Sequence, residues 1–179
     1  MNKIALVRFF STNFFTLMWY YNQLRKEDIM FKISNNTLFM EFDGTNTLVM
    51  EADADYVFDG DVINTILDKS CIYYGSSLNG RIKGSKNIIG SYYKLPVIVS
   101  ERNNIVFFPL KKGNCWWWIN FNSVKYFEKT SNGVLVSFKN ELKKFLNNLK
   151  INFNKIVLTC SGVIIGSIIL TNNNFNNEV

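Results

Sequence analysis

Histidine is absent from this chain of 179 residues. Histidine is the side chain that most often acts as general acid or base at neutral pH, and it is a common zinc ligand. We therefore expect no catalytic residues, no metal site and no cofactor. Cysteine is scarce, and Cys71, Cys115 and Cys160 lie far apart with no Cys-x-x-Cys pair. This spacing argues against a disulfide framework and is typical of a protein in a reducing compartment.

Long uninterrupted apolar runs are also missing. The apolar stretch at 4–21 is broken by Arg8 and Asn13, and the stretch at 156–170 is shorter than the roughly 20 residues of a membrane-spanning helix. The first stretch also lacks the pattern of a secretory signal. The β-branched residues of the second favour a buried strand, or a strand pair bent at Gly162. A small membrane-associated protein with a basic cytosolic domain remains the alternative interpretation.

Charge is distributed unevenly along the chain. Residues 1–60 hold 5 basic and 8 acidic side chains, whereas residues 61–179 hold 15 basic and 6 acidic ones. A basic body is typical of a protein that binds a polyanion, either nucleic acid or a membrane surface, although it also serves solubility. The acidic window between Lys32 and Lys69 is interpreted as a solvated face.

Apolar periodicity predicts an α+β fold: a single domain with a mostly antiparallel sheet and a few helices. A helix is predicted over 61–74, capped by Asp59 or Asp61 and ended by Gly75. Residues 140–150 favour a second helix, with a hairpin turned at 139–140 as the alternative. Strands are predicted at 48–50, 56–58, 88–93, 97–99, 105–108, 116–121, 124–127 and 134–138.

Two further features of the strands are predicted from local sequence. Asn132-Gly133, between two apolar runs, indicates a tight hairpin, and a second hairpin is predicted at Asn35-Asn36 within 31–40. Because side chains alternate along a strand, Trp116 and Trp118 are expected on one face and Trp117 on the other, with Trp118 in the core.

The segment from Gly75 to Lys86 is glycine-rich and basic. Its Gly75-x-x-x-x-Gly80-Arg81 spacing lacks the Lys-Ser/Thr pair of a nucleotide-binding loop. We interpret it as a flexible loop in which glycines let a partner approach, polar groups donate to phosphate and cations supply charge. Arg81 suits a narrow minor groove. Lys111 and Lys112, predicted in a turn between two strands, are further candidates for phosphate contact. The candidate DNA-binding residues are therefore Ser76, Ser77, Asn79, Arg81, Lys83, Lys86, Lys111 and Lys112.

The same segment resembles the competence transcription factor family, ComK. The family signature Ser-Cys-x-aromatic-aromatic-Gly-Ser-Ser, followed by Gly-Arg-x-x-Gly, is matched at 70–77 and 80–84. Similar motifs follow downstream at Lys94-Leu95-Pro96-Val97-Ile98-Val99, Phe107-Phe108-Pro109 and Trp118-Ile119-Asn120.

The resemblance implies a cytoplasmic, nucleoid-associated activator of competence (DNA-uptake) genes. It implies binding to AT-rich double-stranded DNA from the minor-groove side, as a homodimer or tetramer, and control by an adaptor of a Clp protease. On this basis we divide the chain into an N-terminal extension at 1–29, a ComK-like DNA-binding domain at 30–150 and a diverged apolar C-terminal segment at 151–179.

Overall fold

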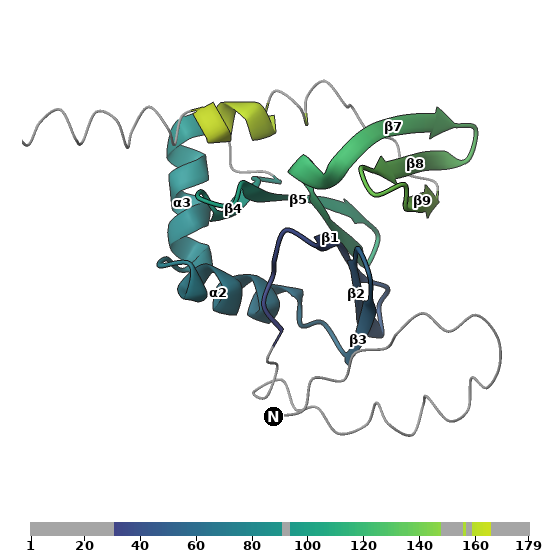
Figure 1. The fold of residues 1–179 in the computed structure, drawn as a ribbon, viewed down its shortest axis with the longest axis horizontal. Helices are drawn as coiled ribbons and strands as arrows, with labels where there is room; N and C mark the ends of the chain where they lie inside the picture. The colour runs from purple at the N-terminus through teal and green to yellow at the C-terminus, as the bar shows by residue number, and fades with distance from the viewer. Residues whose placement is uncertain (1–30, 91–93, 148–155, 157–158, 166–179) are drawn as a thin grey trace, which may run out of the picture.

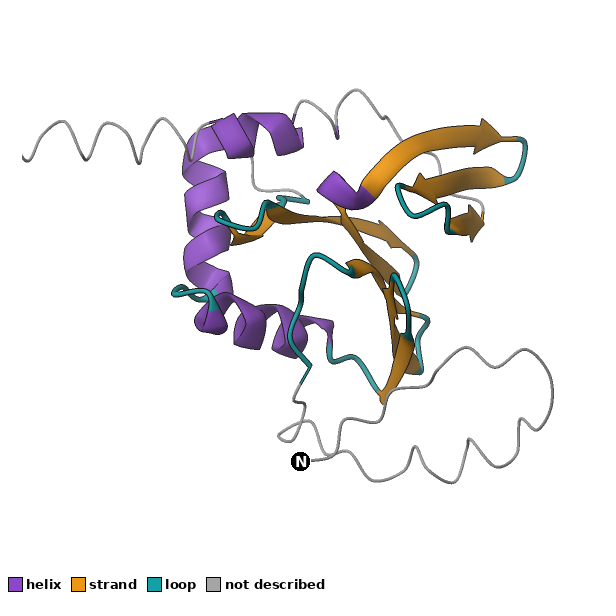
Figure 2. Cartoon of the chain, viewed as in Figure 1, coloured by secondary structure: helices purple, strands orange, loops and turns teal. Residues whose placement is uncertain are grey.

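The computed structural model describes residues 31–90, 94–147, 156 and 159–165. Its elements form three layers: the helices at 63–73 and 78–89 on one side, a six-stranded sheet in the middle, and a three-stranded sheet with the helical residues 159–165 on the other side (Figure 1). The predicted α+β class with antiparallel strands is confirmed, and Figure 2 shows the two longest helices on one side of the strands. Within the described ranges, no helix combines the length and the apolar character that crossing a bilayer requires.

The central sheet is built from two three-stranded meanders. Its strands pair antiparallel throughout in the order β3-β2-β1-β6-β5-β4. The second meander follows the helices along the chain, and β6 then pairs with β1. The bounds are β1 Thr37–Phe42, β2 Asn46–Glu51, β3 Asp55–Asp59, β4 Val97–Ser100, β5 Ile105–Lys112 and β6 Cys115–Asn120.

Alternation along these strands gives the central sheet two apolar faces. Met40 and Trp118 pack with the helices in one core cluster, whereas Phe39 and Trp117 belong to the cluster on the opposite face. The predicted split of the three tryptophans is confirmed, and Trp118 is 8% exposed. Both faces of the sheet are covered by other elements because both are apolar.

The smaller sheet covers the second face. It consists of β7 Val124–Thr130, β8 Gly133–Phe138 and β9 Lys143–Asn147, preceded by the short 3-10 helix η3 at Phe121–Ser123. Val134, Val136 and Phe138 of β8 are buried against the central sheet. The predicted Asn132-Gly133 hairpin is confirmed, since Thr130 of β7 pairs with Gly133 of β8 across that turn.

Helix α2, at Ile63–Tyr73, confirms the helix predicted over 61–74. The Ile63 N–H donates to the Asp61 carboxylate at 3.3 Å, although the cap position itself is Val62. The helix buries Ile63, Ile66, Leu67, Ser70 and Cys71 against the sheet. Gly75 follows in the left-handed conformation, with a φ of 86°, and so ends the helix as predicted.

The predicted flexible loop at 75–86 and the predicted strand at 88–93 are wrong over the described residues. Residues Leu78–Ile89 form helix α3, capped by Ser77 at one end and by left-handed Gly90 at the other. Leu78, Ile82 and Ile89 recur at helical spacing and are half-buried. Caps at both ends and this apolar stripe outweigh the poor helix propensity of Gly80 and Gly84.

Four other predictions are corrected. Residues 143–147 form β9 rather than a helix, because a turn at Glu141, with a φ of 66°, brings Leu146 under β8. Residues 159–165 are helical rather than extended, because Cys160 and Val163, three residues apart, are both buried. The turn at 35–36 precedes β1, whose hairpin partner is β2. Lys111 and Lys112 end β5 instead of lying in a turn.

Candidate nucleic-acid interface

Helix α3 presents a polar face to solvent. It carries three basic side chains and no acidic one. Its exposed positions recur at spacings that place them on one side of the helix, and they are Asn79, Gly80, Lys83, Gly84 and Asn87. The opposite side faces the body, where the Ser85 hydroxyl donates to the Pro96 carbonyl at 2.7 Å. In Figure 1, α3 lies along the outer edge of the molecule, away from β7, β8 and β9.

The N-terminal end of α3 is held by hydrogen bonds from the preceding helix and turn. The Gly80 N–H donates to the Ser77 hydroxyl at 3.0 Å, and the Leu78 N–H donates to the Asp68 carboxylate of α2 at 2.9 Å. The Ser76 N–H donates to the Cys71 carbonyl at 2.9 Å. Ser76 and Ser77 therefore fix the junction of the two helices as well as lying beside the exposed face.

The two glycines of α3 have different surroundings. A Cβ at Gly80 would lie 3.2 Å from the Ser77 hydroxyl and 3.3 Å from that of Ser76, so the capping turn leaves little room there. A Cβ at Gly84 would meet no atom within 4 Å. Glycine inside a helix is about 1 kcal/mol less favourable than alanine. Nothing within the described chain requires that penalty at Gly84, which leaves the outer face of α3 flat.

Arg81 faces the body rather than solvent. Its Nη1 lies 2.5 Å from Oε1 of Glu101, in the turn between β4 and β5, and its side chain is only 17% exposed. Its Nε is buried and has no hydrogen-bond partner within the described part of the chain. Burial raises the pKa of the nearby Cys71 thiol to about 11, against the opposing effect of the Arg81 charge. The guanidinium is thus held inside the junction of α2, α3 and β4.

The candidate lysines fall into two separate places. Lys83 is exposed on α3 without a hydrogen bond or ion pair to any described residue, and Lys86 is half-buried one turn further on. Lys111 is exposed at the far end of β5, with its Nζ 4.5 Å from the Trp116 ring centroid. From Ile105, beside the turn that holds Glu101, β5 extends about 20 Å to this lysine. Residues 76–86 are therefore brought together, whereas Lys111 and Lys112 lie apart from them.

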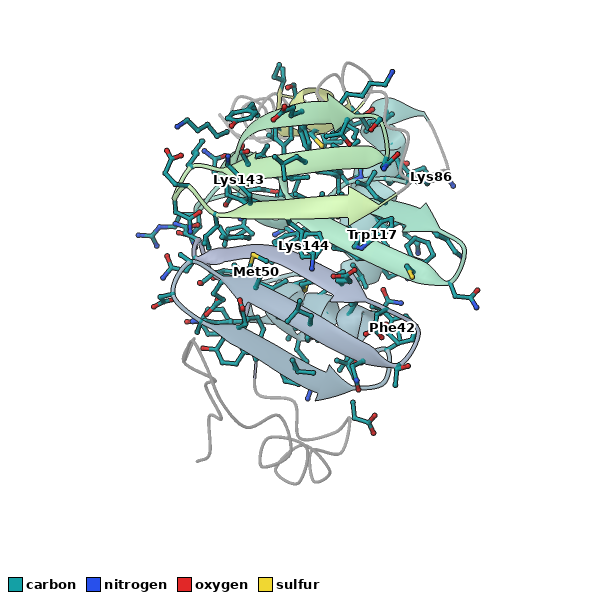
Figure 3. All side chains as sticks on the ribbon, turned by 90° about the vertical axis from the view of Figure 1, so that its right-hand side faces the viewer. Phe42, Met50, Lys86, Trp117, Lys143 and Lys144 are labelled. Atoms are coloured by element: carbon teal, nitrogen blue, oxygen red, sulfur yellow. The ribbon has the colours of Figure 1, made fainter. Side chains whose placement is uncertain are left out.

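Another partly buried cation, Lys144, joins the two sheets instead of facing a partner. Nζ of Lys144 on β9 lies 2.6 Å from Glu41, whose other carboxylate oxygen accepts from Nε1 of Trp117 at 2.8 Å. Figure 3 shows Lys144 and Trp117 close together between the small sheet and β1. The charge of Lys144 is thus neutralised within the fold, whereas Lys83 remains exposed on α3.

Three residues of this region escaped the sequence-based reasoning. Asp68 caps a helix that begins ten positions later, Glu101 pairs with Arg81 across twenty positions, and Asn87 lies on the exposed face of α3. The i, i+4 spacing from Lys83 to Asn87 would have revealed the last of these, had the segment been recognised as a helix. The other two depend on tertiary contacts.

Among the described residues, no three histidine, cysteine or acidic side chains cluster in a way that would hold a metal ion. Residues 29–158 match a family model described as ComK protein. Comparison with curated proteins and with solved structures gives no match.

Proposed function

Because this chain belongs to the ComK family of competence transcription factors, we propose that it activates DNA-uptake genes by binding AT-rich duplex DNA. The observation that carries the proposal is the exposed face of α3, on which Lys83 stands between two asparagines and beside two glycines. Lysine neutralises phosphates, and asparagine amides donate to phosphate oxygens. This face has no acidic side chain that would repel the DNA backbone.

The glycines give the proposed surface its shape. At Gly84 the helix backbone itself is the outermost feature, since no neighbouring atom lies within 4 Å of where a Cβ would stand. A sugar–phosphate strand is able to approach such a backbone more closely than it approaches a helix covered by side chains. Ser76 and Ser77 lie at the positive end of the helix dipole, where phosphate is favoured.

Arg81 supplies the proposed minor-groove contact. AT-rich tracts narrow that groove and deepen its negative potential, which favours a guanidinium. In the free protein the guanidinium is bound to Glu101, so we infer that it exchanges this carboxylate for DNA. Lys86 stands at the edge of the same surface, on the last turn of α3.

Lys111 and Lys112 form a second proposed contact with the same duplex. Their separation of about 20 Å from the turn beside Arg81 corresponds to roughly six base pairs at 3.4 Å each. Strands β1 to β3 and the two turns between them hold six of the eight carboxylates between Lys32 and Lys69, so we expect this part of the protein to make no contact with the DNA backbone. Assembly of two or four copies on DNA, nucleoid association and turnover through a Clp adaptor belong to the same proposal.

The test is a titration of the full chain with an AT-rich duplex and a GC-rich duplex of equal length at several salt concentrations. We expect tighter binding to the AT-rich duplex and an affinity that falls steeply with salt, because bound lysines displace counterions. Lys111→Ala should weaken binding to both duplexes about equally. Equal affinity for the two duplexes, or an affinity independent of salt, would contradict the proposal.

A further inference from the structure

The ion pair between Arg81 and Glu101 joins a proposed DNA-binding residue to an acidic side chain of the same chain. The partners come from different elements, α3 and the turn between β4 and β5, and their oxygen and nitrogen atoms lie 2.5 Å apart. Their exposure is unequal, since the Arg81 side chain is 17% exposed and that of Glu101 is 45% exposed. Glu101 is therefore the more solvent-exposed partner of the pair.

The pair with Glu101 satisfies only some of the N–H donors of the Arg81 guanidinium. One bond joins Nη1 to Oε1 of Glu101, while Nε is buried and finds no acceptor among the residues that the structure describes. A guanidinium makes its strongest contacts through two parallel N–H donors, as it does with phosphate. The contact with Glu101 leaves a donor unsatisfied, and this is unfavourable for a buried polar group.

Building on the proposed function, we propose that Glu101 is a positioning residue that competes with DNA for Arg81. In the free protein it holds the guanidinium against the body and neutralises its charge. On DNA the guanidinium swings outward and exchanges the single bond to a carboxylate for contacts with the groove. Glu101 thereby lowers the affinity for DNA sites that engage Arg81, because the ion pair must be broken there, and it leaves sites that do not engage the arginine unaffected.

The exchange keeps a negatively charged partner beside the guanidinium throughout. One charge-assisted contact replaces another, so the guanidinium is never left buried without a counter-charge. Partly exposed ion pairs contribute little to stability, so DNA has little to overcome in breaking this one. The turn that carries Glu101 is exposed at positions 101–104, so the carboxylate is free to face solvent once Arg81 has left.

The experiment is a double-mutant cycle on DNA binding, using Glu101→Gln, Arg81→Gln and the double variant. Each protein is titrated with the same AT-rich and GC-rich duplexes at fixed salt, after thermal unfolding has shown that it is folded. Glu101→Gln should tighten binding to the AT-rich duplex about two- to fivefold, the range expected for release of a partly exposed ion pair. In the Arg81→Gln background the same substitution should change the affinity little.

Two further variants separate charge from competition. Glu141→Gln removes an equal charge from an exposed pair elsewhere, in which Lys125 Nζ lies 2.6 Å from the carboxylate, and it should alter affinity less than Glu101→Gln. Glu101→Asp keeps the charge but withdraws it by one methylene, so it should give an intermediate gain.

An equal gain from Glu101→Gln with and without Arg81 would overturn the competition, because the acid would then act only as a repelling charge. A loss of affinity would overturn it too, since the pair would then hold α3 in its binding position. Both results leave the proposed function intact. Failure of the unaltered protein to bind any duplex would overturn the two proposals together.

Discussion

Helices α2 and α3 follow one another along the chain and have nearly the same length, 11 and 12 residues, yet they are built for different tasks. Helix α2 buries five side chains, including Ile66 and Leu67, whereas Ser85 is the one fully buried residue of α3. Helix α3 also contains two glycines and three cations. Helix α2 stabilises the sheet, whereas α3 contributes less to stability and presents an exposed, basic surface.

The difference shows how tertiary contacts stabilise a helix of low intrinsic propensity. The caps of α3 come partly from its neighbour, since the Asp68 carboxylate of α2 accepts the Leu78 N–H. The side facing the body is held by Arg81 and by Ser85, which bond to the β4–β5 turn and to Pro96. Residues on the outer side of α3 therefore contribute little to stability. Substitutions on α2 should mainly change the free energy of unfolding, and substitutions on the outer side of α3 should mainly change DNA binding.

The largest effect is expected from opening the core under α2. Ile66→Ala should lower the free energy of unfolding by about 2–5 kcal/mol, because it leaves a cavity at a side chain that is fully buried. Urea denaturation measures this loss. The matched control is Ile82→Ala on α3, where the side chain is only half-buried and the loss should be less than half as large. Equal losses would show that α3 belongs to the core as much as α2 does.

A second effect concerns the buried thiol of α2. Burial raises the pKa of Cys71 from the ordinary value of 9.0 to about 11. Below pH 9 the thiol is protonated in both states, but above it the unfolded chain ionises first, so stability is lost as the pH rises toward 11. The free energy of unfolding should fall more steeply between pH 8 and 10 in the unaltered protein than in Cys71→Ala. A constant gap between the two would contradict the expectation.

The contrast between the helices also shows which parts of the fold could be predicted from the sequence. Helix α2 was predictable because its buried residues recur at helical spacing between an acidic start and Gly75. The hairpin at 132–133 and the alternation of the three tryptophans follow equally local rules. Helix α3 was missed because glycines are strong local signals for a loop, whereas part of its capping comes from Asp68, ten positions away.

The candidate site was predictable to a similar extent. Motif resemblance located the segment 76–86, which the structure keeps together on one helix and its capping turn. It did not show which side chains face outward, and Arg81 faces the body because Glu101 lies across from it in the fold. The distance between Lys111 and α3 could not be predicted either, because it depends on the direction in which β5 runs in the fold.

A smaller effect on stability, but a clear one on binding, is expected at Lys83. Lys83→Ala removes an exposed cation, so the free energy of unfolding should change by less than about 0.5 kcal/mol. DNA affinity should fall several-fold on AT-rich and GC-rich duplexes alike, and the slope of log affinity against log salt should become shallower by about 1. Lys83→Arg is the control, and it should retain both affinity and slope. An unchanged slope for the alanine variant would remove Lys83 from the phosphate contacts.

The smallest change tests the comparison most sharply, because stability and binding should move in opposite directions. Gly84→Ala adds one methyl group to the outer face of α3, where no atom lies within 4 Å of the new Cβ. Alanine favours the helix by about 1 kcal/mol, so the free energy of unfolding should rise by up to that amount. The same methyl group would stand between the helix backbone and the DNA strand, so affinity should fall. Gly162→Ala, in the helical segment 159–165 and likewise with no atom within 4 Å of the new Cβ, is the matched control and should leave affinity unchanged. If Gly84→Ala stabilised the protein and bound DNA as well as before, close approach at Gly84 would be excluded, and the helix would contact DNA through its side chains alone.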